Sequence, residues 1–253
     1  MSGGLLSRLV QLLLPTRCAL CQQLGPQVVC ESCRSGLEPV GPRCCPRCGR
    51  RRLTEFASPD CSECFGRSLG VTRARSLYIY NETGRALLAE FKFKGHLGAG
   101  LALIDPLAAW AGAGITALYG EPDLRFDFAV PVPLHKSRLR HRRFNQAELI
   151  AQRVARAAGL GLRPELLARI RDTETQVGKS ANQRLLNVRG AFAVPQQQRA
   201  GLAGRRVLLV DDLMTTGATL GACARALRRG GSGPVYGLTL FSTHRELEPP
   251  GEL

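Results

Sequence analysis

Residues 207–220 read VLLVDDLMTTGATL, and this stretch decides the fold of the 253-residue chain. Four consecutive aliphatic residues are typical of a buried strand, and two adjacent carboxylates, Asp211 and Asp212, follow them. Hydroxyl residues and a glycine then lead into a segment with helical spacing. A strand that passes through a short polar turn into a helix is the repeating unit of α/β proteins. We therefore predict a sheet built around this strand.

The turn after this strand has the composition of a phosphate-binding turn. The first N–H groups of a helix have no acceptor within the helix, and the helix dipole favours an anion beside them. Asp211 and Asp212 are suited to accept hydrogen bonds from a ribose diol. An ordinary capped helix with water-facing acids is the alternative, but two carboxylates at a buried strand's end are costly without a partner. The candidate phosphate-binding residues are Thr215, Thr216, Gly217, Ala218 and Thr219.

Strands and helices alternate along the rest of the chain from about residue 69. The predicted strands are residues 76–80, 126–132, 206–210 and 235–242, and the predicted helices are residues 83–94, 98–114, 145–158 and 216–229. This alternation predicts an α/β fold, a mostly parallel twisted sheet flanked by helices on both faces. In such sheets ligands bind beyond the carboxyl ends of the strands.

A strongly basic segment follows the predicted strand 126–132. We expect a loop at the ligand-binding edge that contacts an anionic ligand or a nucleic-acid backbone, with a solvated turn as the alternative. The net charge of +15 also suits an anionic partner, although arginine-rich usage in a GC-rich genome would produce part of it. Lys92 is either a surface charge or a phosphate contact, Asn145 is a predicted helix cap, and residues 171–190 are either a flap or a plain surface loop. The basic residues of the predicted loop are Lys136, Arg138, Arg140, Arg142 and Arg143.

Nine of the ten cysteines lie within residues 18–64, and eight of these nine form four C-x-x-C turns. Two such turns supply four thiolates to one tetrahedral ion, so the segment predicts two closed, structural zinc sites. The turns pair either in sequence or interleaved, and Cys44 is either a spare thiol or a substitute ligand. The predicted ligands are Cys18, Cys21, Cys30, Cys33, Cys45, Cys48, Cys61 and Cys64.

The first fourteen residues make a poor export signal, because their apolar run is interrupted and has no small-residue cleavage site. The run is also too short to span a bilayer, and it suits a short amphipathic helix. We therefore expect a cytoplasmic protein without a membrane span, in which reduced thiols favour metal. The predicted division is an N-terminal helix with a zinc module in residues 1–68 and a ligand-binding α/β domain in residues 69–253.

The pattern Asp-Asp-x-x-Thr-Thr-Gly-Ala-Thr after an aliphatic strand resembles the phosphoribosyl pyrophosphate (PRPP) signature of type I phosphoribosyltransferases. Together with the cysteine module, nearly the whole chain resembles the ComF family of competence-associated proteins, which combine a double zinc ribbon with a phosphoribosyltransferase-like domain. The other segments that carry this resemblance are residues 91–95, 130–134 and 142–147, with Gln176, Arg184, Asn187 and Phe192.

The resemblance implies a role for each part of the site. Asp211 and Asp212 would bind the ribose hydroxyls, residues 215–219 would hold the 5′-phosphate, and the basic loop would contact pyrophosphate, with Mg²⁺ accompanying PRPP. It also implies a protein that assists DNA uptake or processing in natural transformation. Its expected partners are PRPP or a related phosphoribosyl ligand, single-stranded DNA and a competence helicase.

Two other functions fit the same sequence: an active phosphoribosyltransferase in nucleotide synthesis or salvage, and a zinc-ribbon nucleic-acid adaptor with a vestigial ligand site. Thr215 stands where purine-salvage relatives place a carboxylate that acts as general base, and threonine performs that role poorly at neutral pH. No base-binding hood is recognisable in the sequence. Both features favour ligand binding over turnover. Arg143 also stands where the family usually has glycine.

Overall fold

A sheet of five parallel strands forms the centre of the protein in a computed structural model, which describes residues 16–52, 61, 64, 68–173 and 181–243. The strand order is β3-β9-β8-β4-β5, and every pairing is parallel. The predicted parallel α/β fold is therefore confirmed. The strands are β3 (Ala74–Ile79), β4 (Phe128–Pro131), β5 (Gly161–Leu162), β8 (Val207–Met214) and β9 (Val235–Ser242).

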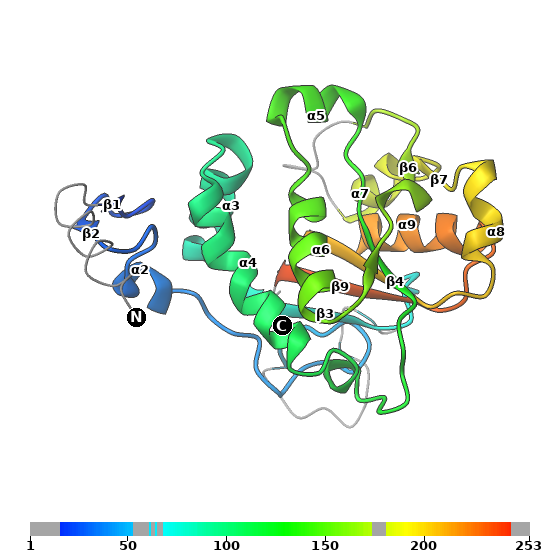
Figure 1. The fold of residues 1–253 in the computed structure, drawn as a ribbon, viewed down its shortest axis with the longest axis horizontal. Helices are drawn as coiled ribbons and strands as arrows, with labels where there is room; N and C mark the ends of the chain where they lie inside the picture. The colour runs from blue at the N-terminus through cyan, green and yellow to red at the C-terminus, as the bar shows by residue number, and fades with distance from the viewer. Residues whose placement is uncertain (1–15, 53–60, 62–63, 65–67, 174–180, 244–253) are drawn as a thin grey trace, which may run out of the picture.

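Helices cover both faces of the sheet. Side chains along β8 point alternately to the two faces and enter two separate hydrophobic cores. Val207 and Leu209 pack with α9 (Ala218–Arg229), whereas Leu208 and Val210 pack in the core of the other face. Figure 1 shows α9 with α8 on one side of the molecule and α3 with α4 on the other. The helices of the second core are α3 (Glu82–Phe93), α4 (Leu97–Gly112) and α6 (Gln146–Ala157). Short elements complete this domain: η1 (Ala117–Tyr119), η2 (Pro164–Leu166), η3 (Gln196–Gln198) and α8 (Arg199–Leu202).

Strand β8 is longer than its sequence predicts. We expected it to end at Val210, but its pairing with β9 continues, with Asp211 opposite Thr239 and Met214 opposite Ser242. Successive polar residues after an aliphatic run indicate the end of a strand. Here pairing with the buried strand β9 continues the hydrogen-bonded ladder beyond Val210. The two acids therefore lie inside a hydrogen-bonded strand.

The prediction of a loop for the basic segment is wrong. Residues Lys136–Arg142 form helix α5. His135 precedes it, and its Nδ1 accepts a hydrogen bond from the N–H of Ser137 at 3.4 Å. The helix was missed because its sequence, KSRLRHR, has a single apolar residue and no hydrophobic periodicity. It follows β4 at the carboxyl edge of the sheet, at the top of Figure 1.

A small antiparallel pair encloses the predicted flap. Strand β6 (Ala168–Arg169) pairs with β7 (Phe192–Ala193), and α7 (Ala181–Asn187) lies in the sequence between them. Residues 174–180, which include Gln176, lie outside the described residues, so the flap stays a prediction. The predicted amphipathic helix at residues 1–14 also lies outside them.

The cysteine-rich segment forms two ribbons that pack in different places. The first contains β1 (Thr16–Arg17), β2 (Leu24–Gly25) and α2 (Glu31–Ser35), and it lies beside α3 and α4 (Figure 1). The second packs against the sheet itself, where Gly49 allows close approach: a Cβ on Gly49 would lie 2.4 Å from the carbonyl oxygen of Ala74. Among the described residues, every helix is too short or too polar to cross a bilayer.

Candidate ligand site and zinc centres

The eight predicted metal ligands form two four-sulfur clusters, and the turns pair in sequence. Within each cluster the ligand atoms all lie within 4.8 Å of one another. The sulfur atoms of Cys21 and Cys30 are 3.6 Å apart, and those of Cys48 and Cys61 are 3.5 Å apart. Four sulfurs at about 2.3 Å from a tetrahedral zinc ion would be separated by about 3.8 Å, so the geometry fits structural zinc. The clusters are Cys18, Cys21, Cys30, Cys33 and Cys45, Cys48, Cys61, Cys64, with Cys44 in neither.

The two clusters differ in burial. Cys45, Cys48 and Cys64 have no exposed surface and belong to the same hydrophobic core as β8 and α9. In the first cluster, Cys21 is exposed and Cys30 is half-buried. The second zinc centre is therefore part of the core of the sheet, whereas the first lies nearer the surface.

The predicted acid pair lies at the carboxyl end of β8 and has a lysine partner. Lys92 Nζ donates to Asp212 Oδ1 at 2.8 Å, and both side chains are largely buried, with 16% and 13% exposed. Asp211 Oδ1 accepts from the backbone N–H of Asp212 at 2.9 Å. Burial, and then the negative charge of Asp212, raise the pKa of Asp211 to about 7. Lys92 is therefore a buried partner of the acid pair.

Two arginines complete the positive surroundings of the acids. Burial lowers the pKa of Arg142, and the charge of Asp212 opposes that shift. Burial also lowers the pKa of Arg169, whose positive charge in turn favours the ionised form of Asp211. Arg169 Nε and Gln146 Nε2 are buried without a hydrogen-bond acceptor among the described residues. Buried N–H donors that lack an acceptor and lie close to a positive charge are suited to bind an anion.

Sequence reasoning missed Arg169. It lies in β6, where its guanidinium is 5.4 Å from the ring centroid of Phe192 and donates to the hydroxyl of Thr173. Strand β6 is only two residues long, too short to show a periodic pattern, so the sequence carried no signal for Arg169.

Helix α5 divides the five predicted basic residues into two groups. Arg138 and Arg142, four residues apart on one face, are half-buried, and Arg138 donates to the carbonyl of Thr173. Arg142 also lies over the ring of Phe93, 5.0 Å from its centroid, although that ring is 71% exposed. One face of α5 therefore turns toward the acid pair and the other toward solvent. The exposed basic residues are Lys136, Arg140 and Arg143.

The predicted phosphate-binding turn joins β8 to α9. Gly217, the residue before the first turn of α9, has a left-handed backbone with φ 77° and ψ 4°. Thr216 Oγ1 accepts from the N–H of Ala218 at 3.4 Å, a long hydrogen bond that makes a weak cap. The structure thus brings three features to the same edge of the sheet: the acid pair, this turn, and the face of α5 that carries Arg138 and Arg142, its inner face.

Arg143 has a backbone conformation that favours glycine, with φ 64° and ψ −16° at the end of α5. A left-handed conformation costs a side-chain-bearing residue about 1–2 kcal/mol. We expect Arg143→Gly to raise the free energy of unfolding by about 1 kcal/mol, measured by urea denaturation. Arg140→Gly, within α5, is the control and should lower it by about 1 kcal/mol. A destabilised Arg143→Gly protein would contradict this explanation.

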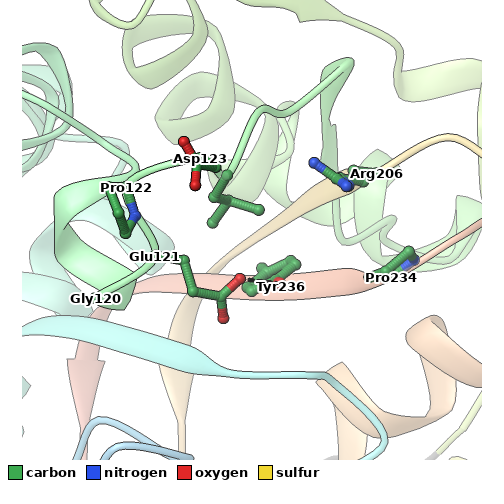
Figure 2. A pocket seen from close by; sticks show the side chains of 8 residues that line it. Gly120, Glu121, Pro122, Asp123, Arg206, Pro234 and Tyr236 are labelled. Atoms are coloured by element: carbon green, nitrogen blue, oxygen red, sulfur yellow. Dashed lines mark hydrogen bonds between the residues drawn. The ribbon is translucent and has the colours of Figure 1, made fainter.

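A separate cavity of about 400 Å³ opens at the other edge of the sheet, where β8 and β9 begin. Figure 2 shows Tyr236 beside Glu121, and the tyrosine hydroxyl donates to Glu121 Oε2 at 2.8 Å. Arg206, Pro234 and residues 120–124 complete the lining, which contains none of the predicted ligand residues. This cavity is therefore distinct from the site at the carboxyl edge.

Comparison with known proteins identifies two domains in the chain. A double zinc ribbon domain matches residues 9–65, and a phosphoribosyl transferase domain matches residues 145–250. Competence protein ComFC of Bacillus subtilis is 33% identical over 217 residues, which cover 84% of this chain and 83% of that protein. The chain belongs to the ComF family.

Other ComF relatives have names that refer to competence or DNA. Competence protein F of Haemophilus influenzae is 27% identical and covers 85% of this chain and 92% of its own. DNA utilization protein YhgH of Escherichia coli K12 is 29% identical and covers 88% and 96%. Among solved structures, TT1426 of Thermus thermophilus has a TM-score of 0.32 and 15% identity, over 56% of this chain and 84% of that one.

Proposed function

We propose that this ComF protein binds PRPP or a related ribose 5-phosphate ligand at the carboxyl edge of its sheet, and that binding assists DNA uptake or processing in the cytoplasm. The acid pair surrounded by positive groups carries the proposal. Asp211 and Asp212 offer acceptors to a ribose diol, while Lys92, Arg142 and Arg169 balance their charge. A ligand with hydroxyls at its centre and phosphates at both ends matches this pattern.

Each phosphate group of such a ligand has suitable donors. The 5′-phosphate would bind the turn of residues 215–219, at the N-terminus of α9. The diphosphate would bind the inner arginines of α5 and Arg169, whose Nε lacks an acceptor among the described residues. Carboxylates and diphosphate oxygens are also the ligands that Mg²⁺ prefers, so Mg²⁺ with PRPP fits the same site.

Calorimetric titration of the zinc-loaded protein with PRPP and Mg²⁺ tests this proposal. We expect PRPP to bind more tightly than ribose 5-phosphate or pyrophosphate, because it engages both phosphate subsites at once. Absence of PRPP binding to the folded protein would contradict the proposed function. Pyrophosphate release in the presence of candidate bases would instead establish an active phosphoribosyltransferase, which Thr215 in the general-base position disfavours.

The outer face of α5 supports the role in DNA handling. Lys136, Arg140 and Arg143 are exposed. Exposed basic groups bind single-stranded nucleic acid through phosphate contacts, and an exposed aromatic ring such as Phe93, which lies against Arg142 on the other face, adds base stacking. The names of the relatives refer to competence and to DNA utilization. The partners we propose are single-stranded DNA and a competence helicase that acts alongside. A zinc-ribbon adaptor would bind DNA without binding PRPP.

The two faces of α5 are expected to affect different ligands. Arg142→Ala should weaken PRPP binding about tenfold, since a hydrogen bond to a charged group contributes about 1.5–3 kcal/mol. The double variant Lys136→Ala, Arg140→Ala should leave PRPP affinity unchanged. Its single-stranded DNA binding should depend less on salt, with a slope of log affinity against log salt smaller by about 1.4. Equal effects of both variants on both ligands would show that α5 has no such division.

A further inference from the structure

Arg50 extends from the second zinc ribbon to the turn of the proposed phosphate site. Its side chain is buried, with 4% of the residue exposed. Nε donates to the carbonyl oxygen of Thr243 at 3.0 Å, and Nη2 donates to the carbonyl oxygen of Thr215. Thr215 is the first residue after β8, and two residues separate it from α9. A cation from the zinc ribbon therefore bonds directly to the backbone of this turn.

The backbone of Arg50 belongs to the zinc knuckle itself. The N–H of Cys45 donates to the carbonyl of Arg50 at 2.8 Å, and the N–H of Gly49 donates to the carbonyl of Cys45 at 2.9 Å. These bonds close the turn that holds Cys45 and Cys48 in position. A zinc ion with four thiolates carries a net double negative charge, which favours a guanidinium nearby. The position of Arg50 thus depends on an intact knuckle.

Fixing the Thr215 carbonyl also fixes the next N–H group. The peptide bond between Thr215 and Thr216 is planar and trans, so its C=O and N–H point in opposite directions. The same carbonyl accepts from Thr243 Oγ1 at 3.3 Å, and the N–H of Thr243 donates to the carbonyl of Met214 at 3.0 Å. Because the Thr215 carbonyl is held toward the ribbon, the Thr216 N–H points away from the ribbon.

We infer that Arg50 is a positioning residue for phosphate binding: by holding the Thr215 carbonyl, it orients the Thr216 N–H toward the ligand, and the second zinc centre thereby sets phosphate affinity. This inference rests on the proposed function. Arg50 acts on the backbone of the turn and leaves the diphosphate subsite, on α5 and β6, untouched. It should therefore affect one half of the ligand selectively.

The selectivity gives the test, with Arg50→Met as the variant and Arg51→Met as its matched control. Arg51 follows Arg50 in the same ribbon but bonds to Glu38 and to the carbonyl of Val40. In Arg50→Met with its full zinc content, ribose 5-phosphate affinity should fall about tenfold and pyrophosphate affinity should stay unchanged. Arg51→Met should bind both as the unaltered protein does. The Thr216 amide resonance in ¹⁵N NMR spectra should move in Arg50→Met and not in Arg51→Met.

The other outcomes separate this inference from the proposed function. If the unaltered protein binds neither PRPP nor ribose 5-phosphate, the proposed function fails. If it binds them and zinc-loaded Arg50→Met binds ribose 5-phosphate equally well, or loses both ligands to the same extent, the inference is overturned. Should Arg50→Met not fold, Arg50→Lys keeps the charge but loses the forked geometry. Unchanged ribose 5-phosphate affinity and an unmoved Thr216 resonance in Arg50→Lys would overturn the inference.

Discussion

Replacing Cys48 with serine is expected to unfold the protein, whereas replacing Cys21 with serine should leave the sheet folded. Both changes remove one sulfur from a four-sulfur cluster. A structural zinc site contributes about 10–16 kcal/mol of apparent binding free energy, which is comparable to the whole stability of a domain, about 5–15 kcal/mol. How much of the protein unfolds when a cluster loses its zinc ion depends on which core that cluster packs in.

The second cluster holds together the core on one face of the sheet. Its buried sulfurs pack in the same core as Leu69, Met214 and Leu220. The chain after the cluster lies against α9, where a Cβ on Gly70 would come within 2.7 Å of the Cα of Gly221. Loss of this zinc ion would leave thiols without a metal inside the core and detach the second ribbon from α9. Of the sulfurs of the first cluster, Cys33 alone packs against the other core, and it is only partly buried, so loss of this zinc ion exposes less of that core.

Thermal unfolding followed by circular dichroism, together with metal analysis, checks this expectation. The unaltered protein should contain about two zinc ions per chain. Cys21→Ser should contain one and melt within a few degrees of it, whereas Cys48→Ser should lack a cooperative transition. Equal losses of melting temperature in the two variants would show that the clusters contribute alike.

The sequence predicted four of the five strands because they are buried and aliphatic, and it missed β5, whose two residues are too few for a pattern. Strand β9 begins and ends where its apolar run does, and the predicted cap of α6 is confirmed, since Asn145 Oδ1 accepts from the N–H of Ala147 at 3.2 Å. Helix α5 could not be predicted in this way because arginine carries no periodic apolar signal. The division of the chain at residues 68 and 69 stays a prediction.

The candidate site was predicted in part, for a reason that lies in its construction. Asp211, Asp212 and the turn after them are contiguous in sequence, so local pattern and chemistry indicate them together. Arg169 and Arg50 reach the same region from segments 42 and more than 160 residues away. The contacts of Arg50 with the carbonyls of Thr215 and Thr243 depend on the folded topology, and Arg169 lies in a two-residue strand that is too short for a local pattern.

Asp211→Asn is expected to stabilise the free protein while it removes ligand binding. Burial and the neighbouring charge of Asp212 raise the pKa of Asp211 to about 7, above the value of about 3.9 in an unfolded chain. Between these values the folded protein binds more protons than the unfolded chain, so stability falls as pH rises from about 4 to 7. Asparagine removes the buried charge. The free energy of unfolding should therefore rise by about 4 kcal/mol at pH 8 and change little near pH 4.

Asp127→Asn is the control of opposite sign. Burial raises the pKa of Asp127, but hydrogen bonds from the Arg206 N–H and the Arg205 side chain outweigh it and lower the pKa overall. Losing that carboxylate should destabilise the protein at pH 8, and PRPP affinity should stay unchanged.

In Asp211→Asn the affinity for PRPP should fall about 100-fold at pH 8, since a charged acceptor for a ribose hydroxyl is lost. A stabilised Asp211→Asn protein that still bound PRPP fully would confirm the buried charge and refute its role in binding, because the two effects depend on the same carboxylate for different reasons.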